Sequence, residues 1–231
     1  MPPSSDVLPR LRRADPDRFL CTLFAPAEKR DILALLYLFN NELARAREVA
    51  SEPTLALIRL QWWREVVEGA KKKHELATPL SAALDEGLFV RNDLLSLVEA
   101  REAEAEPIRG RDEFLAYARG TGGRLARIAG KVLGADSQAL EDLGTAYAIS
   151  GILRATPFLA RQNRSLLPQD GTPEEVLVSH ARELLVARPP RAALAAALPA
   201  ALARRDLGRT YRPRGMADRF VILCAAVTGR V

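Results

Sequence analysis

Apolar residues that recur every three or four positions are the feature of this chain that most constrains its fold. Ile32, Leu35, Leu36, Phe39 and Leu43 form one such stripe, which is the pattern of a helix that buries one face. Similar spacing returns in most later segments, and no stretch shows the two-residue alternation of a half-buried strand. The sequence therefore predicts an all-α fold.

Proline and glycine divide the chain into its expected helices. Asp15-Pro16 is typical of an N-cap followed by proline at the first helical position, and Pro26 begins the next helix in the same manner. Because 231 residues can bury one sizeable core, we expect an N-terminal arm at residues 1–14 and one helical domain at residues 15–231. Later helices are expected at residues 80–88, 93–101, 112–132, 137–161, 173–187, 192–205 and 217–227.

Composition indicates a soluble globular protein, with 48% apolar and 27% charged residues. Cys21 and Cys224 each lie in an apolar stretch, so we expect both as buried free thiols. His74 and His180 have no partner at metal-binding spacing. No apolar run reaches the roughly 18 residues that cross a bilayer, and the N-terminus does not resemble a secretory signal, which predicts a cytoplasmic protein.

The region from residue 182 to residue 219 is rich in arginine. It holds nine arginines and three acidic residues, Glu183, Asp206 and Asp218, in a chain of net charge +5. This region could contact anionic lipid headgroups or an acidic partner, or it could be an ordinary solvated helix face.

Gly120-Thr121-Gly122-Gly123 lies inside a helical pattern. A phosphate-binding loop would need a preceding strand and a following lysine with serine or threonine, and neither is found. The run therefore predicts a bent helix or a close approach of two helix backbones.

Two segments carry a resemblance to a known family. Residues 37–48 read YLFNNELARARE, and residues 143–168 contain LGTAY, GILRA and a closing RSLLP. Both resemble the aspartate-rich blocks of the squalene/phytoene synthase family, and the resemblance spans roughly residues 17–170. Positions between and before the blocks also match, at Phe19, Pro26, Arg30, Trp63-Arg64, Tyr117 and Gly123. The resemblance implies an isoprenoid (terpenoid) synthase fold, a helical bundle around a central cavity.

The family's magnesium ligands are largely missing from these blocks. Prenyl transfer requires metal ions that neutralise the departing diphosphate, and aspartates on facing helices hold them. Glu48 is the one carboxylate left at the six expected positions, and Arg45 places a positive charge where a metal would approach. Pro157 also predicts a bent or broken helix in the second block. The six positions are Ala44, Arg45, Glu48, Ala155, Phe158 and Leu159. We therefore expect no cofactor and no catalytic residue.

The resemblance still implies a vestigial substrate cavity. Arg154 and Arg164 could grip a diphosphate or an anionic headgroup, or they could clamp helices through ion pairs. Trp63, with Trp62, could be a core residue or part of a cavity wall. The expected cavity residues are Tyr37, Arg45, Glu48, Trp63, Tyr117, Arg154 and Arg164.

One branch of the family resembles the chain more than the synthases do. In the respiratory complex I assembly factors, the first block reads like residues 39–44, FNNELA, and is followed by stretches like residues 49–53 and 58–64. The resemblance implies a noncatalytic protein that acts in complex I assembly, or that binds an isoprenoid or anionic lipid, at the inner face of a membrane. Complex I subunits or assembly intermediates are the implied partners, with a mitochondrial location in a eukaryote, and nucleic acid is not expected. The alternatives are an active prenyltransferase that condenses prenyl diphosphates and a soluble polyprenyl lipid carrier.

Overall fold

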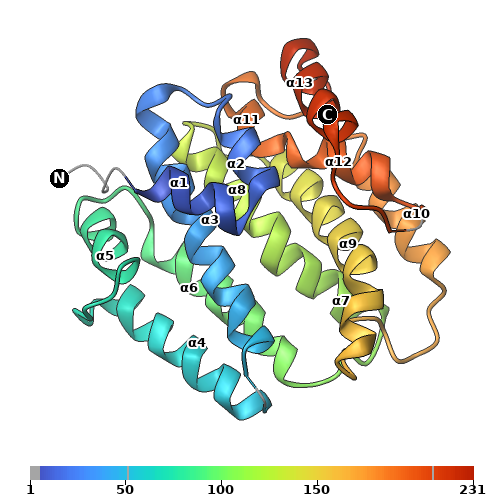
Figure 1. The fold of residues 1–231 in the computed structure, drawn as a ribbon, viewed down its shortest axis with the longest axis horizontal. Coiled ribbons are helices and arrows are strands. Elements are labelled where there is room, and N and C mark those ends of the chain that lie inside the picture. The colour runs from blue at the N-terminus through green and yellow to red at the C-terminus, as the bar shows by residue number, and fades with distance from the viewer. Residues whose placement is uncertain (1–5, 51, 210) are drawn as a thin grey trace. The chain divides into compact units, whose positions relative to one another are not determined.

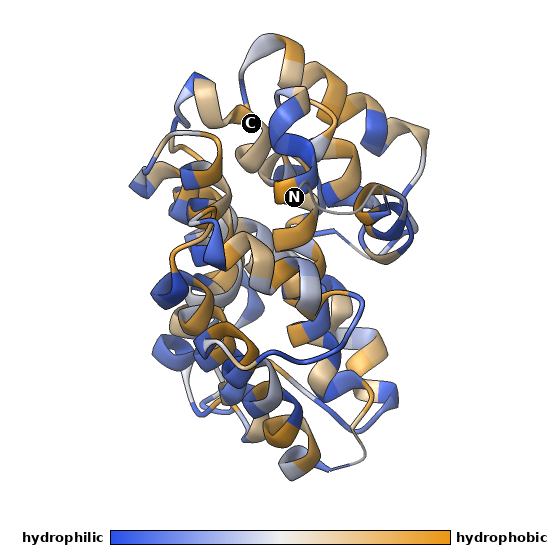
Figure 2. Cartoon of the chain, turned by 90° about the vertical axis from the view of Figure 1, so that its left-hand side faces the viewer, coloured by the Kyte–Doolittle hydropathy of each residue, from blue (hydrophilic) through white to orange (hydrophobic). Residues whose placement is uncertain are grey.

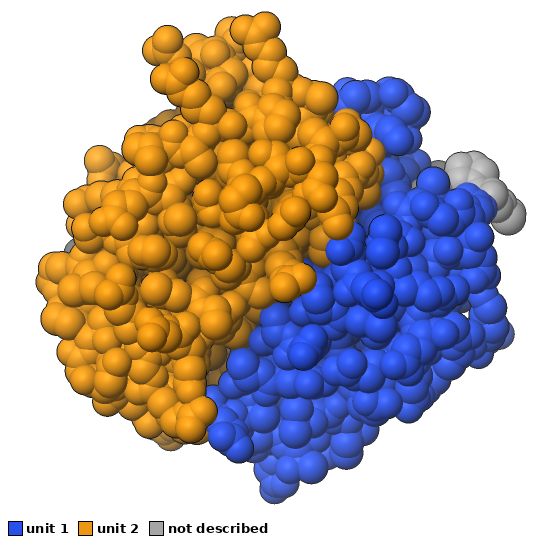
Figure 3. Space-filling model, turned by 180° about the vertical axis from the view of Figure 1, so that it is seen from behind, with its two compact units in different colours: residues 1–106 blue, residues 107–231 orange. Residues whose placement is uncertain are grey.

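The computed structural model describes residues 6–50, 52–209 and 211–231, and these residues form helices and no strand (Figure 1). The all-α prediction is confirmed. The chain divides into two compact units, residues 1–106 and residues 107–231, which are coloured separately in Figure 3. The expectation of a single domain from residue 15 onward stays a prediction.

The first unit is built around one long helix, α3 (Ala27–Glu48), which buries Leu35, Leu36 and Phe39 completely. The other helices of the unit all contact α3, except for a short 3-10 turn, η1, that packs on α4 and α6. Their bounds are α1 (Val7–Ala14), α2 (Pro16–Thr22), α4 (Pro53–Glu68), α5 (Ala77–Asp85), α6 (Arg91–Glu102) and η1 (Ala103–Ala105). The stripe that the sequence shows on this segment is therefore the core of the unit.

The residues assigned to an N-terminal arm include a helix. α1 packs on α3 and buries Val7 and Leu11, so this part of the chain contributes to the core of the first unit. The next boundary agrees with the sequence analysis, because the side chain of Asp15 accepts a hydrogen bond from the N–H of Arg18 and Pro16 is the first residue of α2.

The second unit is arranged around α9 (Gln138–Arg161). Helices before and after it in the sequence pack on it, and Figure 1 shows α12 beside it. The other elements are α7 (Arg111–Ala118), η2 (Arg119–Gly123), α8 (Arg124–Val132), α10 (Glu174–Leu184), η3 (Arg191–Ala193), α11 (Leu194–Ala197), α12 (Pro199–Asp206) and α13 (Met216–Thr228).

The glycine run at residues 120–123 is a place where two helices touch through their backbones. η2 is a turn of π-helix that lies against α9. A Cβ atom on Gly122 would lie 2.7 Å from the carbonyl oxygen of Gly144, and a Cβ on Gly144 would lie 2.4 Å from that of Gly122. Neither position can hold a larger residue without a backbone shift. The predicted close approach is confirmed.

Two local predictions are wrong, and one of two alternatives at Pro157 is excluded. α9 is not broken at Pro157 but continues to Arg161, and Pro157 is on the exposed side, where water can bond the carbonyl that a proline leaves free. The expected helix at residues 192–205 is divided before Pro199, and its alanines are mostly buried in the unit. Cys224 is exposed, because it lies on the outer side of α13, whereas Cys21 is buried as expected.

Most helices carry polar and apolar residues on the same element, as Figure 2 shows by hydropathy. Among the described residues, no helix combines the length and the apolar character that a membrane span needs.

Candidate functional site

The first block lies on α3, and its residues have different surroundings. Tyr37 is buried, with the guanidinium carbon of Arg18 5.6 Å from its ring centroid. Burial raises the pKa of Tyr37 well above its ordinary value, which keeps the phenol protonated. Arg45 and Glu48 are exposed near the end of α3, and Nη1 of Arg45 lies 3.6 Å from Oε1 of Glu42. Tyr37 is thus a core residue, whereas Arg45 and Glu48 are accessible.

Trp63 on α4 belongs to an aromatic cluster. Its buried ring meets Phe39 edge-on at a centroid distance of 5.6 Å and Trp62 at 4.8 Å. The ring of His74 lies 5.3 Å from that of Trp63, and its Nδ1 accepts a hydrogen bond from the N–H of Leu76 at 3.1 Å. The spacing of His74 in the sequence gives no sign of this role, which depends on packing against Trp62 and Trp63.

Trp62, Trp63 and His74 of this cluster line a pocket in the first unit, which we call the tryptophan pocket. Its volume is about 360 Å³, near the lower end of small-molecule sites. Arg45 and Arg59 add two guanidinium groups to this lining and Glu42 adds one carboxylate, which is paired with Arg45. The surplus of one positive charge beside apolar and aromatic side chains suits an anionic amphiphile. The lining residues are Glu42, Arg45, Ala46, Val49, Ile58, Arg59, Trp62, Trp63 and His74.

Arg154 on α9 is engaged by the protein itself. Its Nη1 lies 3.5 Å from Oδ1 of Asp206 and donates a hydrogen bond of 3.3 Å to the carbonyl of Arg212. Its guanidinium carbon also lies 5.1 Å from the ring centroid of Tyr211. These contacts join α9 to the segment between α12 and α13, which favours the interpretation of Arg154 as a clamp.

The seven expected cavity residues are divided between the two units. Four of them, Tyr37, Arg45, Glu48 and Trp63, lie in the first unit, and three, Tyr117, Arg154 and Arg164, lie in the second. Tyr117 is buried on α7, and Arg164 is half-buried in the segment that follows α9. Within the first unit, Arg45 and Trp63 line a common pocket.

Two buried aspartates in the second unit are surrounded by arginines. Asp206 ends α12, and its Oδ2 lies 2.7 Å from Nη1 of Arg214. Asp218, in the first turn of α13, pairs through Oδ1 with Arg212 at 2.6 Å and with Arg205 at 3.2 Å. Together with Arg154, these residues form a group that we call the aspartate clasp.

The protonation state of Asp218 follows from these contacts. Burial alone would raise its pKa, but the N–H of Gly215, at 2.8 Å, and the guanidinium of Arg212 outweigh burial. They hold the pKa of Asp218 below its ordinary value, so the carboxylate is charged at neutral pH.

The aspartate clasp changes the interpretation of the arginine-rich region. Arg205, Arg212 and Arg214 neutralise buried acids, so they do not form the free cationic surface that the sequence suggested. A count of charges does not show these pairs, because they depend on the burial of Asp206 and Asp218. Arg214 and Asp218 are only four residues apart, and Nη1 of Arg214 lies 3.9 Å from Oδ1 of Asp218, so this spacing is a signal of the clasp that the sequence carries.

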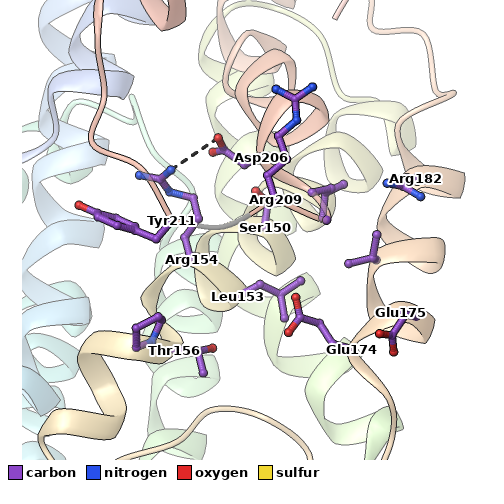
Figure 4. Close-up of a pocket in the computed structure, with 14 residues that line it drawn as sticks. Ser150, Leu153, Arg154, Thr156, Glu174, Glu175, Arg182, Asp206, Arg209 and Tyr211 are labelled. Carbon is purple, nitrogen blue, oxygen red and sulfur yellow. Dashed lines mark ion pairs between the residues drawn. The ribbon is translucent and has the colours of Figure 1, made fainter.

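A larger pocket, of about 730 Å³, lies beside the aspartate clasp in the second unit (Figure 4). In Figure 4 the ion pair of Arg154 and Asp206 lies on one side, and Glu175 and Arg182 on α10 lie on the other. Glu174 also lines the pocket. The lining thus mixes both charges and lacks the uniform positive field that a diphosphate would favour.

Comparison with known families gives a match to squalene/phytoene synthase over residues 11–207, which is most of the chain. The chain belongs to the squalene/phytoene synthase family.

Two solved structures of the family share its fold. A dehydrosqualene synthase has a TM-score of 0.75 at 13% identity, covering 96% of this chain and 94% of that one. Squalene synthase HpnC from Alicyclobacillus acidocaldarius has a TM-score of 0.66 at 15% identity, covering 97% and 93%. The predicted isoprenoid synthase fold is confirmed.

The curated relatives in the comparison carry a different kind of name. "NADH dehydrogenase (ubiquinone) complex I, assembly factor 6" of Mus musculus and that of Homo sapiens are each 31% identical over 170 residues, 69% of this chain. The Drosophila melanogaster homolog is 30% identical over 190 residues. The chain spans about half the length of these relatives, 51% to 54%.

The residues at the family's metal-binding positions do not fit a magnesium cluster. Magnesium takes hard oxygen ligands, and of the expected set Glu48 supplies the one carboxylate. Phe158 instead packs edge-on against Tyr211 at a centroid distance of 4.8 Å, and Arg45 carries a positive charge. Within the described ranges, no group of three or more His, Cys, Asp or Glu side chains is placed to hold a metal ion.

Proposed function

We propose that this protein acts in the assembly of respiratory complex I and does not catalyse prenyl transfer. The observation that carries the proposal is the 31% identity, over 170 residues, to proteins named as complex I assembly factor 6. Because the chain spans about half of those proteins, the proposal concerns the function of the shared helical domain.

The side chains of the two blocks support the noncatalytic part of the proposal. Ionisation of a prenyl diphosphate requires neutralisation of the leaving group, which this family achieves with carboxylate-bound metal. Here Phe158 makes an aromatic contact at one of those positions, and Arg45 is a cation at another. The fold remains without the donor set that the reaction needs.

The partners that we propose are complex I subunits or assembly intermediates. The proposed location is the inner face of the membrane that carries complex I, with peripheral attachment, and this membrane is mitochondrial in a eukaryotic host. The names of the relatives, which refer to complex I, support these partners.

A second candidate function is the binding of an anionic isoprenoid or lipid in the tryptophan pocket. Trp62 and Trp63 supply an apolar surface, and Arg45 and Arg59, set against Glu42, leave a surplus of one positive charge. This function is compatible with a noncatalytic role, because binding a lipid, unlike prenyl transfer, needs no metal site.

Deletion of the gene in a host that has complex I tests the assembly role. We expect lower NADH:quinone activity and unchanged carotenoid, hopanoid and sterol levels, with recovery when the chain is expressed again. Normal complex I activity with altered isoprenoid products would instead support an active prenyltransferase. Incubation of the purified protein with farnesyl or geranylgeranyl diphosphate and magnesium provides the matching biochemical test, in which we expect no product above a no-enzyme control.

A further inference from the structure

The last helix of the chain, α13, exposes a row of large apolar side chains. Met216, Phe220, Leu223 and Val227 are 76%, 65%, 45% and 79% exposed, respectively. Their spacing of four, three and four residues places them on one face of the helix. We call this face the apolar stripe.

The opposite face of α13 is already occupied. Asp218, Ile222 and Ala225 are buried, and α13 packs against α12, beside which it lies in Figure 1. Single exposed apolar residues are common on protein surfaces, but four that share one helix face indicate a contact surface. The helix is thus apolar on its outer face and anchored to the unit through its inner face.

A groove adjoins the apolar stripe and carries positive charge. Its volume is about 1140 Å³, and Phe220 and Cys224 lie along it. Four arginines line it, and the described lining residues include no aspartate or glutamate. We call it the cationic groove, and its arginines are Arg188, Arg191, Arg204 and Arg230.

The arginines of the cationic groove differ from those of the aspartate clasp. Arg188, Arg191 and Arg230 are exposed. Arg204 donates hydrogen bonds to the carbonyl of Leu185 at 2.6 Å and to an oxygen of Val231 at 3.2 Å. The positive charge of the three exposed arginines next to the apolar stripe therefore acts outward, whereas each arginine of the aspartate clasp contacts a buried carboxylate.

We propose that the apolar stripe and the cationic groove dock the protein on a bilayer that contains anionic phospholipids. α13 lies parallel to the bilayer plane, with Phe220, Leu223 and Val227 among the upper acyl carbons. Guanidinium groups of the groove bind lipid phosphates, for which their planar donor geometry is suited. This combination of an apolar helix face with flanking arginines is the pattern of an interfacial helix.

The charge of the groove also argues against a second copy of the chain as the occupant. In a two-fold symmetric dimer the same surface meets itself, so the arginines of one groove would approach those of the other. Anionic lipid supplies the opposite charge and accepts the apolar stripe at the same time.

The inference rests on the membrane attachment in the proposed function and identifies the surface that makes it. The test uses purified protein and vesicles without complex I. Vesicle binding and the deletion phenotype can therefore fail independently of each other.

Co-sedimentation of the full chain with vesicles measures the docking. We expect binding to vesicles of phosphatidylglycerol mixed with phosphatidylcholine and much weaker binding to phosphatidylcholine alone. The double substitution Phe220→Ser with Val227→Ser should lower the partition coefficient by about tenfold or more, because it removes large apolar side chains from the acyl region. Replacement of Arg188, Arg191 and Arg230 by glutamine should weaken binding to the anionic vesicles and reduce its dependence on salt.

The control replaces two apolar residues of the first unit that are also exposed. Leu88 and Val90 are 45% and 58% exposed, and Leu88→Ser with Val90→Ser should leave vesicle binding unchanged. Circular dichroism should show the same helical content in all variants.

Three results would overturn the proposal. The first is equal vesicle binding by the Phe220/Val227 variant and the unsubstituted chain. The second is equal binding to neutral and anionic vesicles. The third is the absence of vesicle binding together with self-association that the Phe220/Val227 variant abolishes in sedimentation velocity, which would assign the stripe to a second copy.

Discussion

Arg154 offers the sharpest test of whether the second block binds a ligand or holds helices together. We predict that Arg154→Ala destabilises the fold and leaves any binding of prenyl diphosphate unchanged. The substitution removes the ion pair with Asp206, the hydrogen bond to the carbonyl of Arg212 and the contact with the ring of Tyr211.

The size of the effect follows from what remains around Asp206. Removing one partner of a buried ion pair costs about 3 to 5 kcal/mol when the other charge is left alone. Here Arg214 stays 2.7 Å from Oδ2 of Asp206, and the side chain of Arg154 is itself 18% exposed. Both facts reduce the cost, and we expect a loss of about 2 kcal/mol, which is about 4 to 8 °C in Tm for a chain of this length.

Arg45→Ala is the matched control for stability alone, because Arg45 also lines the tryptophan pocket. Arg45 is 53% exposed, and its ion pair with Glu42 is a surface pair of 3.6 Å, so its removal should cost less than about 0.5 kcal/mol. Arg154→Lys should recover part of the lost stability, because it keeps the charge but not the planar geometry.

Thermal unfolding followed by circular dichroism gives the stabilities, and titration with farnesyl diphosphate gives the affinities. The reasoning fails if Arg154→Ala melts at the temperature of the unsubstituted protein. It also fails if the variant keeps its stability but loses diphosphate affinity, which would make Arg154 a ligand residue.

The remaining predictions concern packing, pH and metal. Gly144→Ala should destabilise the protein by about 1 to 3 kcal/mol in urea unfolding, because the added Cβ meets the backbone of Gly122. Gly151→Ala in the same helix has open space around it and should stabilise the protein slightly. Equal effects of the two substitutions would contradict the close approach of the helices. Because the pKa of Asp218 is lower in the folded state, its carboxylate contributes stability above the unfolded pKa of about 4, and this stability is lost as the pH falls through the folded pKa. In Asp218→Asn, the free energy of unfolding should therefore fall less steeply with decreasing pH. An unchanged slope would show that Asp218 does not contribute. Millimolar magnesium should leave Tm unchanged, because a protein without a metal site gains no stability by mass action, and a concentration-dependent rise in Tm would reveal a site.

The parts of the fold that depend on local chemistry could be predicted from the sequence. The apolar stripe of α3 and the helix start at Asp15-Pro16 each depend on residues within a few positions of one another. α1 could not be predicted in this way, because burial of Val7 and Leu11 depends on packing against α3. The same limit applies to Pro157, whose effect depends on which side of α9 meets water.

The candidate site shows a similar division. The identity of the side chains at the metal-binding positions can be read directly, since a methyl group, a phenyl ring and a guanidinium are not magnesium ligands. The partners of Arg154 could not be read, because the carbonyl that it binds lies 58 residues away in the chain. A count of charges in the arginine-rich region could not show that Asp206 and Asp218 are buried among them.

The aspartate clasp has a consequence for how the end of the chain can vary. Each aspartate contacts at least two arginines, so the loss of one arginine weakens the clasp but leaves both carboxylates with a partner. The loss of an aspartate is different in kind, because it leaves guanidinium groups close together and repelling one another. Across variants of this protein, the replacement of one clasp arginine should cost less stability than the replacement of Asp206 or Asp218.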